Sequence, residues 1–280
     1  MADFADSIPN PKFEGRLPST PMNPAPSVSI REALGQSPVR TNPARLLYAA
    51  FALLLVVVTF LGFQRFYLHG RAYPDRVIPA PMLPLIVTHG AAMTGWIVLF
   101  LVQPLLIVGN HRRLHMTLGK IGGGLAAIIV GVGLIVPIEV VRHGPEFTLW
   151  GLTRRQFMAI PIFSVLLFGL FVTIGIWNRR RPQIHRPMML LATLSIIAAA
   201  TDRITGLSEL YSESLWGRVF GPYFPALLVG ALFLVVKWLL TWSFDRWYSV
   251  GFAALVAAWA AIMVVATSAP WARIASFLAG

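Results

Sequence analysis

The sequence predicts an all-α membrane protein, a polytopic helical bundle of about seven transmembrane helices with its N-terminus in the cytoplasm. Of the 280 residues, 56% are hydrophobic and 12% are charged, and the mean hydropathy is +0.70. Soluble domains carry about twice that share of charged residues, so the composition excludes a soluble enzyme. The apolar residues gather into long runs and most basic residues lie between them, as in a multi-pass membrane protein.

Seven segments without Asp, Glu, Lys or Arg are the predicted transmembrane helices. A helix rises about 1.5 Å per residue, so about 20 residues cross a hydrocarbon core about 30 Å thick. The fifth segment has only 15 residues, but the long side chains of Arg186 and Arg203 beside its ends can carry their charges to the membrane surface. The predicted helices cover 46–64, 77–110, 121–138, 156–178, 187–201, 219–236 and 247–272.

The composition changes sharply near residue 45. Residues 1–44 hold eight prolines among Ser, Asn and scattered charges, which predicts a disordered cytoplasmic tail because such a segment buries too little apolar surface to fold. Residues 45–280 are the predicted transmembrane domain.

The net charge of +12 is explained by the membrane topology and does not indicate a nucleic-acid partner. Nucleic acid would be the expected partner of a soluble domain with this charge. Here the basic residues lie at helix ends, where anionic lipid headgroups explain them, so we expect the lipid bilayer and no nucleic acid as partner. Fourteen of the 23 basic residues fall on the side of the N-terminus, which predicts a cytoplasmic N-terminus. Only three are lysines, as is typical of a GC-rich bacterium, and we therefore expect the bacterial inner membrane.

Histidine is the strong ligand type that this sequence offers. The absence of cysteine excludes disulfides, thiolate metal sites and iron–sulfur clusters. The signatures HExxH, Walker A and GxSxG are also missing. His111 and His115 have the i, i+4 spacing of two ligands on one helix, but two ligands do not make a metal centre, and we expect no bound metal ion of that kind.

Two stretches of the sequence follow the same plan. Residues 95–131 and 168–200 each contain an apolar helix, a tight turn with Asn and Arg, a histidine that opens the next helix, and an apolar helix rich in small residues. The two histidines are His115 and His185. Because both open helices that start on the cytoplasmic side, we expect them at similar depth, where they could face each other.

These two histidines are candidate axial ligands of a haem b. Such a site needs two neutral imidazoles from facing helices, small residues that admit the porphyrin, and arginines that pair with its propionates. Arg113 and Arg186, together with Arg112, are the candidate propionate partners, and the candidate small residues are Gly119, Gly122, Gly123 and Gly124. The alternative is that both histidines pack at the membrane interface and bind lipid phosphate beside arginine.

His89 is the deepest histidine, about seven residues from the outer end of its helix. Ionisable groups at membrane depth usually face the bundle interior. Three interpretations stay open for His89: a neutral ring bonded to a helix carbonyl or to Thr94, a haem or metal ligand, and a group in proton or quinone chemistry. Gln103 lies fourteen residues further on, about 21 Å along the axis, and is a candidate for hydrogen bonding between helices.

Glu139 and Arg203 are candidate polar residues at the outer end of the bundle, and with Gln103 they complete the predicted polar site. One interpretation is an ion pair between their two helices, or between Asp202 and Arg142. The other is a path for protons or substrate lined by His89, Glu139 and Arg203.

The order of these polar residues resembles that of a bacterial family of predicted membrane proteins of unknown function. Its pattern is a deep His, then Gln, then H-R-x-L-G, then H-R-x-M with a terminal Arg, and the match runs from about Pro84 to Ile204. Met116 replaces the Arg after the first of the paired histidines. More distantly, the histidine-bearing helices resemble cytochrome b and ferric-reductase-like bundles, a resemblance that implies haem and electron transfer.

Two functions therefore stay open, and the sequence does not decide whether the chain is an enzyme. The first is a protein that binds haem b or interacts with quinone in electron transfer. The second is a non-enzymatic membrane protein, such as an assembly factor, a subunit of a larger complex or a small permease.

Overall fold

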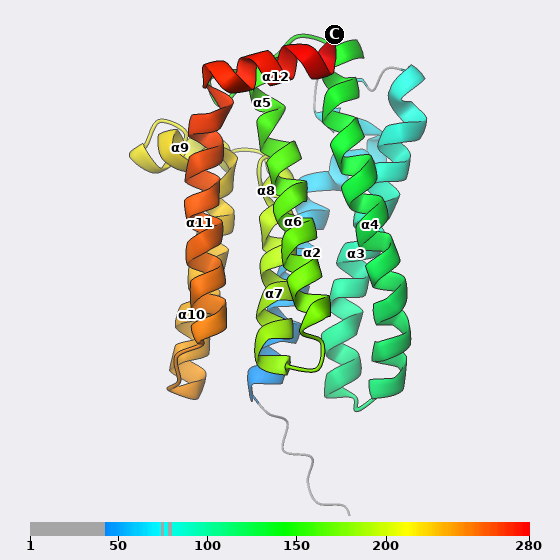
Figure 1. Cartoon of the computed structure of the whole chain (residues 1–280), viewed down its shortest axis with the longest axis vertical. Helices are drawn as coiled ribbons and strands as arrows, with labels where there is room; N and C mark the ends of the chain where they lie inside the picture. The colour runs from blue at the N-terminus through cyan, green and yellow to red at the C-terminus, as the bar shows by residue number, and fades with distance from the viewer. Residues whose placement is uncertain (1–42, 74–75, 78–79) are drawn as a thin grey trace, which may run out of the picture. The chain divides into compact units, whose positions relative to one another are not determined.

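The structure, a computed structural model, describes residues 43–73, 76–77 and 80–280 and confirms an all-α polytopic bundle. Within these residues, seven helical segments are long and apolar enough to cross a membrane (Figure 1). The predicted tail, residues 1–44, lies outside the described residues except for Pro43 and Ala44, which belong to the first turn of the first described helix.

The seven spans are continuous helices or helices joined end to end. They are α2 (Pro43–His69), η1 (Ala80–Met82) with α3 (Leu83–Val108), α4 (Arg112–His143), α5 (Arg154–Phe157) with α6 (Ala159–Trp177), α7 (Pro182–Ile196) with α8 (Ala198–Thr201), α9 (Leu215–Phe220) and η3 (Gly221–Tyr223) with α10 (Phe224–Thr241), and α11 (Arg246–Ala266). A short η2 (Ser208–Leu210) precedes α9.

Two small hairpins close loops on one side of the bundle. Strands β1 (Arg71–Tyr73) and β2 (Arg76–Val77) pair antiparallel, and so do β3 (Thr148–Leu149) and β4 (Leu152–Thr153). Trp150 and Gly151 form the two-residue turn of the second hairpin with φ of 55° and 71°, the left-handed conformation that such a turn requires.

Charged residues proved to be poor markers of where helices begin. The third predicted helix starts at residue 121, whereas α4 starts at Arg112, because helical hydrogen bonding continues through the basic segment that precedes the apolar run. Similarly, α7 starts at Pro182 and not at residue 187. The fifth span is thereby lengthened to 20 residues, Pro182–Thr201.

The predicted end of the last helix, residues 247–272, is wrong because the spanning helix is shorter. The spanning helix α11 stops at Ala266, and a separate helix, α12 (Ala269–Ala279), begins after Ser268, whose side chain accepts a hydrogen bond from the Trp271 N–H at 3.3 Å. The new helix lies across the ends of the spanning helices (Figure 1). Ser268 is an N-cap residue and Pro270 stands in the first turn, so a start signal interrupts the apolar run.

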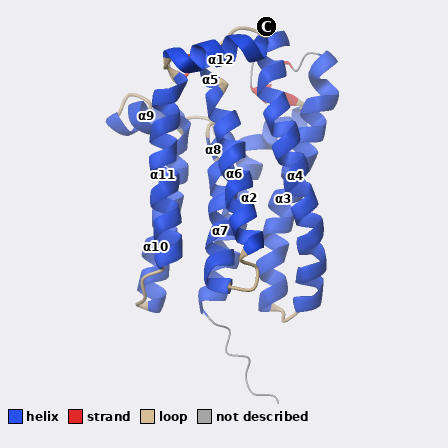
Figure 2. Cartoon of the chain, in the orientation of Figure 1, coloured by secondary structure: helices blue, strands red, loops and turns tan. Residues whose placement is uncertain are grey.

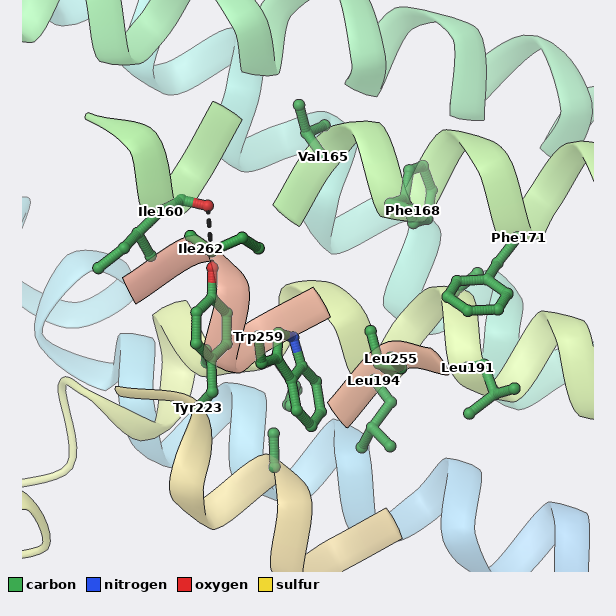
Figure 3. Close-up of a cluster of buried hydrophobic side chains, with 14 of the residues drawn as sticks. Ile160, Val165, Phe168, Phe171, Leu191, Leu194, Tyr223, Leu255, Trp259 and Ile262 are labelled. Carbon is green, nitrogen blue, oxygen red and sulfur yellow. Dashed lines mark hydrogen bonds between the residues drawn. The ribbon is translucent and has the colours of Figure 1, made fainter. Parts of the chain in front are cut away.

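The best-buried core lies where α6, α7 and α11 meet, with side chains from the start of α10 (Figure 3). Trp259 is fully buried and stacks on Tyr223 with ring centroids 5.3 Å apart. The Tyr223 hydroxyl donates to the Ile160 carbonyl at 3.1 Å and also lies 2.8 Å from the Ser164 hydroxyl. The buried phenol is therefore satisfied, as an apolar environment demands.

Helices that follow one another form hairpins, and two of them carry the paired histidines. The helices α3 and α4 pack together, as do α6 and α7, and α4 packs against α6. The connections 109–111 and 178–181, drawn as loops in Figure 2, lie at the same end of the bundle. That end, called the basic end below, also holds the start of α2 and the link from α10 to α11.

Replacement of Gly62 by Ala should destabilise the bundle. A Cβ at Gly62 would overlap the backbone of Ala200, so α2 and α8 would have to separate. We expect a loss of about 1–3 kcal/mol of unfolding free energy, as in other overpacked cores. Thermal unfolding in detergent, followed by tryptophan fluorescence, measures the effect.

The matched control is Gly131→Ala. A Cβ at Gly131 would have no atom within 4 Å, and alanine favours a helix over glycine, so this variant should unfold at the wild-type temperature or above it. Equal melting temperatures for the two variants would contradict the packing of α2 against α8.

Candidate functional site

His185 closes the hairpin between α6 and α7. Its ring nitrogen Nδ1 lies 2.9 Å from the Gly175 carbonyl oxygen, in the last turn of α6. The usual helical partner of that carbonyl, the Arg179 N–H, bonds to Ile176 instead, because the helix ends there. Gly175 is buried, and a Cβ at this position would come within 2.9 Å of Met189 Cε. Glycine therefore allows the two helices to approach closely enough for this bond.

His115 closes the hairpin between α3 and α4 in the same way. Its Nδ1 lies 3.3 Å from the backbone carbonyl oxygen of Gln103, near the end of α3. The Gln103 side chain contacts the same turn of α4: with its amide oxygen toward Gly119, it accepts from that N–H at 3.1 Å and donates to the His115 carbonyl at 3.2 Å. In this orientation Gln103 links α3 to α4, as the prediction of hydrogen bonding between helices supposes.

The structure brings the rings of His115 and His185 into a T-shaped arrangement. Their ring centroids are 6.4 Å apart and the ring planes meet at 89°. Each histidine bonds through Nδ1 to a backbone carbonyl of the preceding helix, over sequence separations of 12 and 10 residues. The two stretches that share a plan in the sequence therefore build the same local structure. The pair formed by His115 and His185 is called the histidine pair below.

The hydrogen bonds indicate the tautomer of one of the two rings. At His185 the Gly175 carbonyl oxygen can only accept, so Nδ1 carries the proton and a neutral ring presents the lone pair of Nε2. At His115 the Gln103 side-chain amide nitrogen also lies against Nδ1 as a donor, so the contact with the Gln103 carbonyl does not fix the tautomer. The bond from His185 is shorter than the contact of His115, 2.9 Å against 3.3 Å. Both rings are half-buried. The arrangement at His185, with a proton held by a backbone carbonyl and a free Nε2, is the usual one for a metal-binding histidine.

Arginines surround the histidine pair. The charges of Arg112 and Arg186 act on His115, and that of Arg186 also acts on His185. Arg113, one of the two arginines named for the propionates, lies on the exposed side of α4. Its role stays a prediction.

Space beside the pair comes from glycine. A Cβ at Gly119, one turn after His115, or at Gly124 would have no atom within 4 Å. The neighbouring Gly122 serves a different purpose, since a Cβ there would lie 2.8 Å from Leu99 on α3. Gly122 thus permits helix contact, while Gly119, which lies on the same face of α4 as His115, leaves open space next to the imidazole.

His89 lies far from this pair, in the outer half of α3. It precedes Gln103 by fourteen residues, about 21 Å along the helix axis. Its Cε1 atom is 3.6 Å from the place where a Cβ of Gly133 would stand, so the ring rests against α4. The buried Nδ1 atom has no hydrogen-bond partner among the described residues. The charge of Arg203 acts on this ring.

Glu139, Arg203 and Gln103 do not form one site. Glu139 pairs with Arg142 at 3.3 Å and with His143 at 3.1 Å, both on its own helix. Among the described residues, no ion pair joins Glu139 to Arg203 or Asp202 to Arg142, because Glu139 and Arg142 pair with each other one turn apart on α4. The guanidinium of Arg203 lies 4.9 Å above the Phe63 ring, near His89.

A second polar cluster lies at the end of the bundle opposite the basic end, and its contacts were not predicted from the sequence. The Trp150 indole donates to Asp202 at 2.7 Å, and its ring stacks on Tyr211 with centroids 5.3 Å apart. Burial raises the pKa of the Tyr211 phenol above its ordinary value, and the Asp202 carboxylate raises it further. A surface cavity of about 520 Å³ lies beside Trp150 and Asp202.

The fold and the site define the chain as a polytopic helical membrane protein with a histidine pair near one end of its bundle. Comparison with known proteins finds no match: no family model, no curated protein and no solved structure is similar to this chain. The resemblance in the order of the polar residues therefore stays a prediction.

Replacement of His185 by Ala should loosen the bundle even in haem-free protein. The variant leaves the Gly175 carbonyl without its donor, which costs about 1–3 kcal/mol for a buried polar group. The melting temperature of haem-free protein in detergent measures this loss.

His111→Ala is the matched control, because His111 is exposed at the same end and precedes α4. We expect its melting temperature to equal that of the wild type. If both variants melt alike, the bond between His185 and Gly175 contributes nothing to stability.

Proposed function

We propose that this protein binds one haem b between His115 and His185 and transfers electrons in the membrane. The observation that carries the proposal is the geometry of the histidine pair: two rings with centroids 6.4 Å apart, each with its Nδ1 within hydrogen-bond distance of a backbone carbonyl of the preceding helix. Two neutral imidazoles from facing helices are one pair of ligands that would give six-coordinate haem iron in a membrane bundle.

The spacing of the rings is compatible with one metal ion shared by the two histidines. Their centroids are 6.4 Å apart, and an imidazole nitrogen would bind a first-row metal at about 2.0–2.1 Å. His115 and His185 are therefore the residues that would hold the iron.

The surroundings of the pair also fit a porphyrin. The open space at Gly119 leaves room for a flat ring beside His115. Arg112 and Arg186, whose charges act on His115, are suited to the propionates. When bound, the haem supplies one-electron redox chemistry. The chain would hold it through His115 and His185, and the bond to the Gly175 carbonyl orients the His185 ring.

We further propose that the protein lies in the inner membrane of a bacterium with its N-terminus in the cytoplasm, and that a quinone is its redox partner. The excess of basic residues at the starts of α2, α4 and α7 supports this orientation. A quinone is soluble in the membrane, and the buried Nδ1 of His89 is a polar atom that a quinone oxygen can pair with.

A second candidate is a structural role as a subunit or assembly factor of a membrane complex, or as a small permease. The observation that favours it is that the same two hydrogen bonds tie α3 to α4 and α6 to α7. Under this function the rings stabilise the hairpins and bind no cofactor.

Absorption spectra of the purified full chain distinguish the two functions. The protein is expressed with ample haem precursor and measured as isolated and after dithionite reduction. We expect a near-stoichiometric haem with a sharp reduced α-band, as six-coordinate haem b gives. His115→Ala and His185→Ala should each lose that band.

Two further variants sharpen the test. His111→Ala should keep the spectrum, because this exposed histidine lies outside the pair. His115→Met should shift the reduction potential upward and keep six-coordinate haem, since Met is also an axial ligand. A featureless spectrum from folded protein rules out the haem function and leaves the structural one.

A further inference from the structure

A second group of basic residues lies at the basic end, where α2, α7 and α10 meet. Lys237 on α10 sits 5.4 Å above the ring of Tyr48 on α2, with its ammonium 3.5 Å from the Tyr48 hydroxyl. Arg45 lies one turn before Tyr48. Arg186 on α7 is close enough for its charge to act on Tyr48, Arg45 and Lys237.

The lysine of this group is already neutralised. Lys237 forms an ion pair with Asp245, and the two side chains are only 14% and 10% exposed. Asp245 also caps α11 by accepting from the Tyr248 N–H at 3.0 Å. This pair therefore holds α10 to the start of α11 and adds no net charge.

Arg45 and Arg186 keep their full charge. Among the described residues neither has a carboxylate within ion-pair distance, and Arg186 is half-buried. The first turns of α2 and α7 hold no acidic residue, so the positive ends of both helix dipoles add to the same potential. Two like charges in a partly desolvated place repel each other unless an anion lies between them.

The position of the two arginines indicates that the anion belongs to a lipid. Arg45 begins one candidate membrane span and Arg186 lies in the first turns of another, and the ends of spanning helices are where lipid headgroups are expected. Two apolar side chains beside these basic residues are exposed: Leu46, next to Arg45, is 46% exposed, and Trp238, next to Lys237, is 48% exposed. Exposed apolar residues at such a position are suited to contact with acyl chains at the membrane interface. A lipid offers both the phosphate and the chains that such a surface contacts.

We infer that Arg45 and Arg186 bind the phosphate of one acidic phospholipid. Each guanidinium donates to the phosphate oxygens, and the Tyr48 hydroxyl, which accepts from Lys237, has its own proton available for a third bond. The acyl chains lie along the exposed apolar side of α2. This lipid site goes beyond the proposed electron transfer. It shares Arg186 with the proposed propionate partners, so the test below includes haem-free protein.

Native mass spectrometry of the delipidated full chain tests the inference. The protein is titrated with phosphatidylglycerol and, separately, with phosphatidylcholine of the same chains. We expect phosphatidylglycerol to bind at least about tenfold more tightly, because charge-assisted hydrogen bonds to a phosphate are the strong ones. Arg45→Gln and Arg186→Gln should each remove most of this preference.

The control is Arg180→Gln, an exposed arginine in the link between α6 and α7 at the same end, which should leave the preference unchanged. Arg45→Lys keeps the charge and should retain part of the affinity for phosphatidylglycerol. If Arg186→Gln does not fold, the comparison of Arg45→Lys with Arg45→Gln tests the site. Equal binding of the two lipids, or an unchanged preference in both glutamine variants, overturns the site.

Two further measurements distinguish binding of a lipid at this site from binding of other anions. Millimolar inorganic phosphate should not displace phosphatidylglycerol, and displacement would mean that the residues bind free phosphate and not a lipid. The titration is repeated on haem-free protein, with the absorption spectrum recorded for each sample. Retention of the preference without haem excludes a propionate as the anion, whereas failure of the haem proposal leaves this result untouched.

Discussion

A backbone carbonyl inside a membrane protein has to find a hydrogen-bond donor, and the end of every helix leaves several carbonyls without one. In this protein the His185 ring supplies the donor for Gly175 at the end of α6, and the His115 ring bonds back to Gln103 near the end of α3. The same bonds that close the hairpins therefore set the direction of both rings. Structure and candidate chemistry depend on one interaction made twice.

Close packing of α4 against α6 brings the two hairpins together. Gly133 faces Val165, and Gly169 faces Val130, each so closely that a Cβ would lie about 3 Å from the opposing valine. Without hydrophobic attraction between helices in lipid, such small residues are what allow tight helix contact. Glycine thus has two roles on α4: it brings the histidine-bearing helices together, and at Gly119 it leaves open the space beside the ring.

Much of this could be predicted from sequence, because apolar runs and a repeated turn are local patterns. They predicted the seven spans and the approach of His115 to His185. The carbonyl partners could not be predicted, since every residue has a carbonyl and only tertiary packing selects Gly175. The proximity of Arg45 to Arg186 is equally a product of long-range packing. The start of α12 was missed although Ser268 signals it, because the surrounding residues are as apolar as a spanning helix.

The central claim is that the histidine pair holds one iron through two imidazoles whose planes are nearly perpendicular, at 89°. Electron paramagnetic resonance of the oxidised protein tests it most directly. The account predicts a low-spin ferric signal of the strongly anisotropic type that perpendicular axial imidazoles produce, lost in His185→Ala. A high-spin signal, or no haem iron in folded protein grown with ample haem precursor, would contradict it.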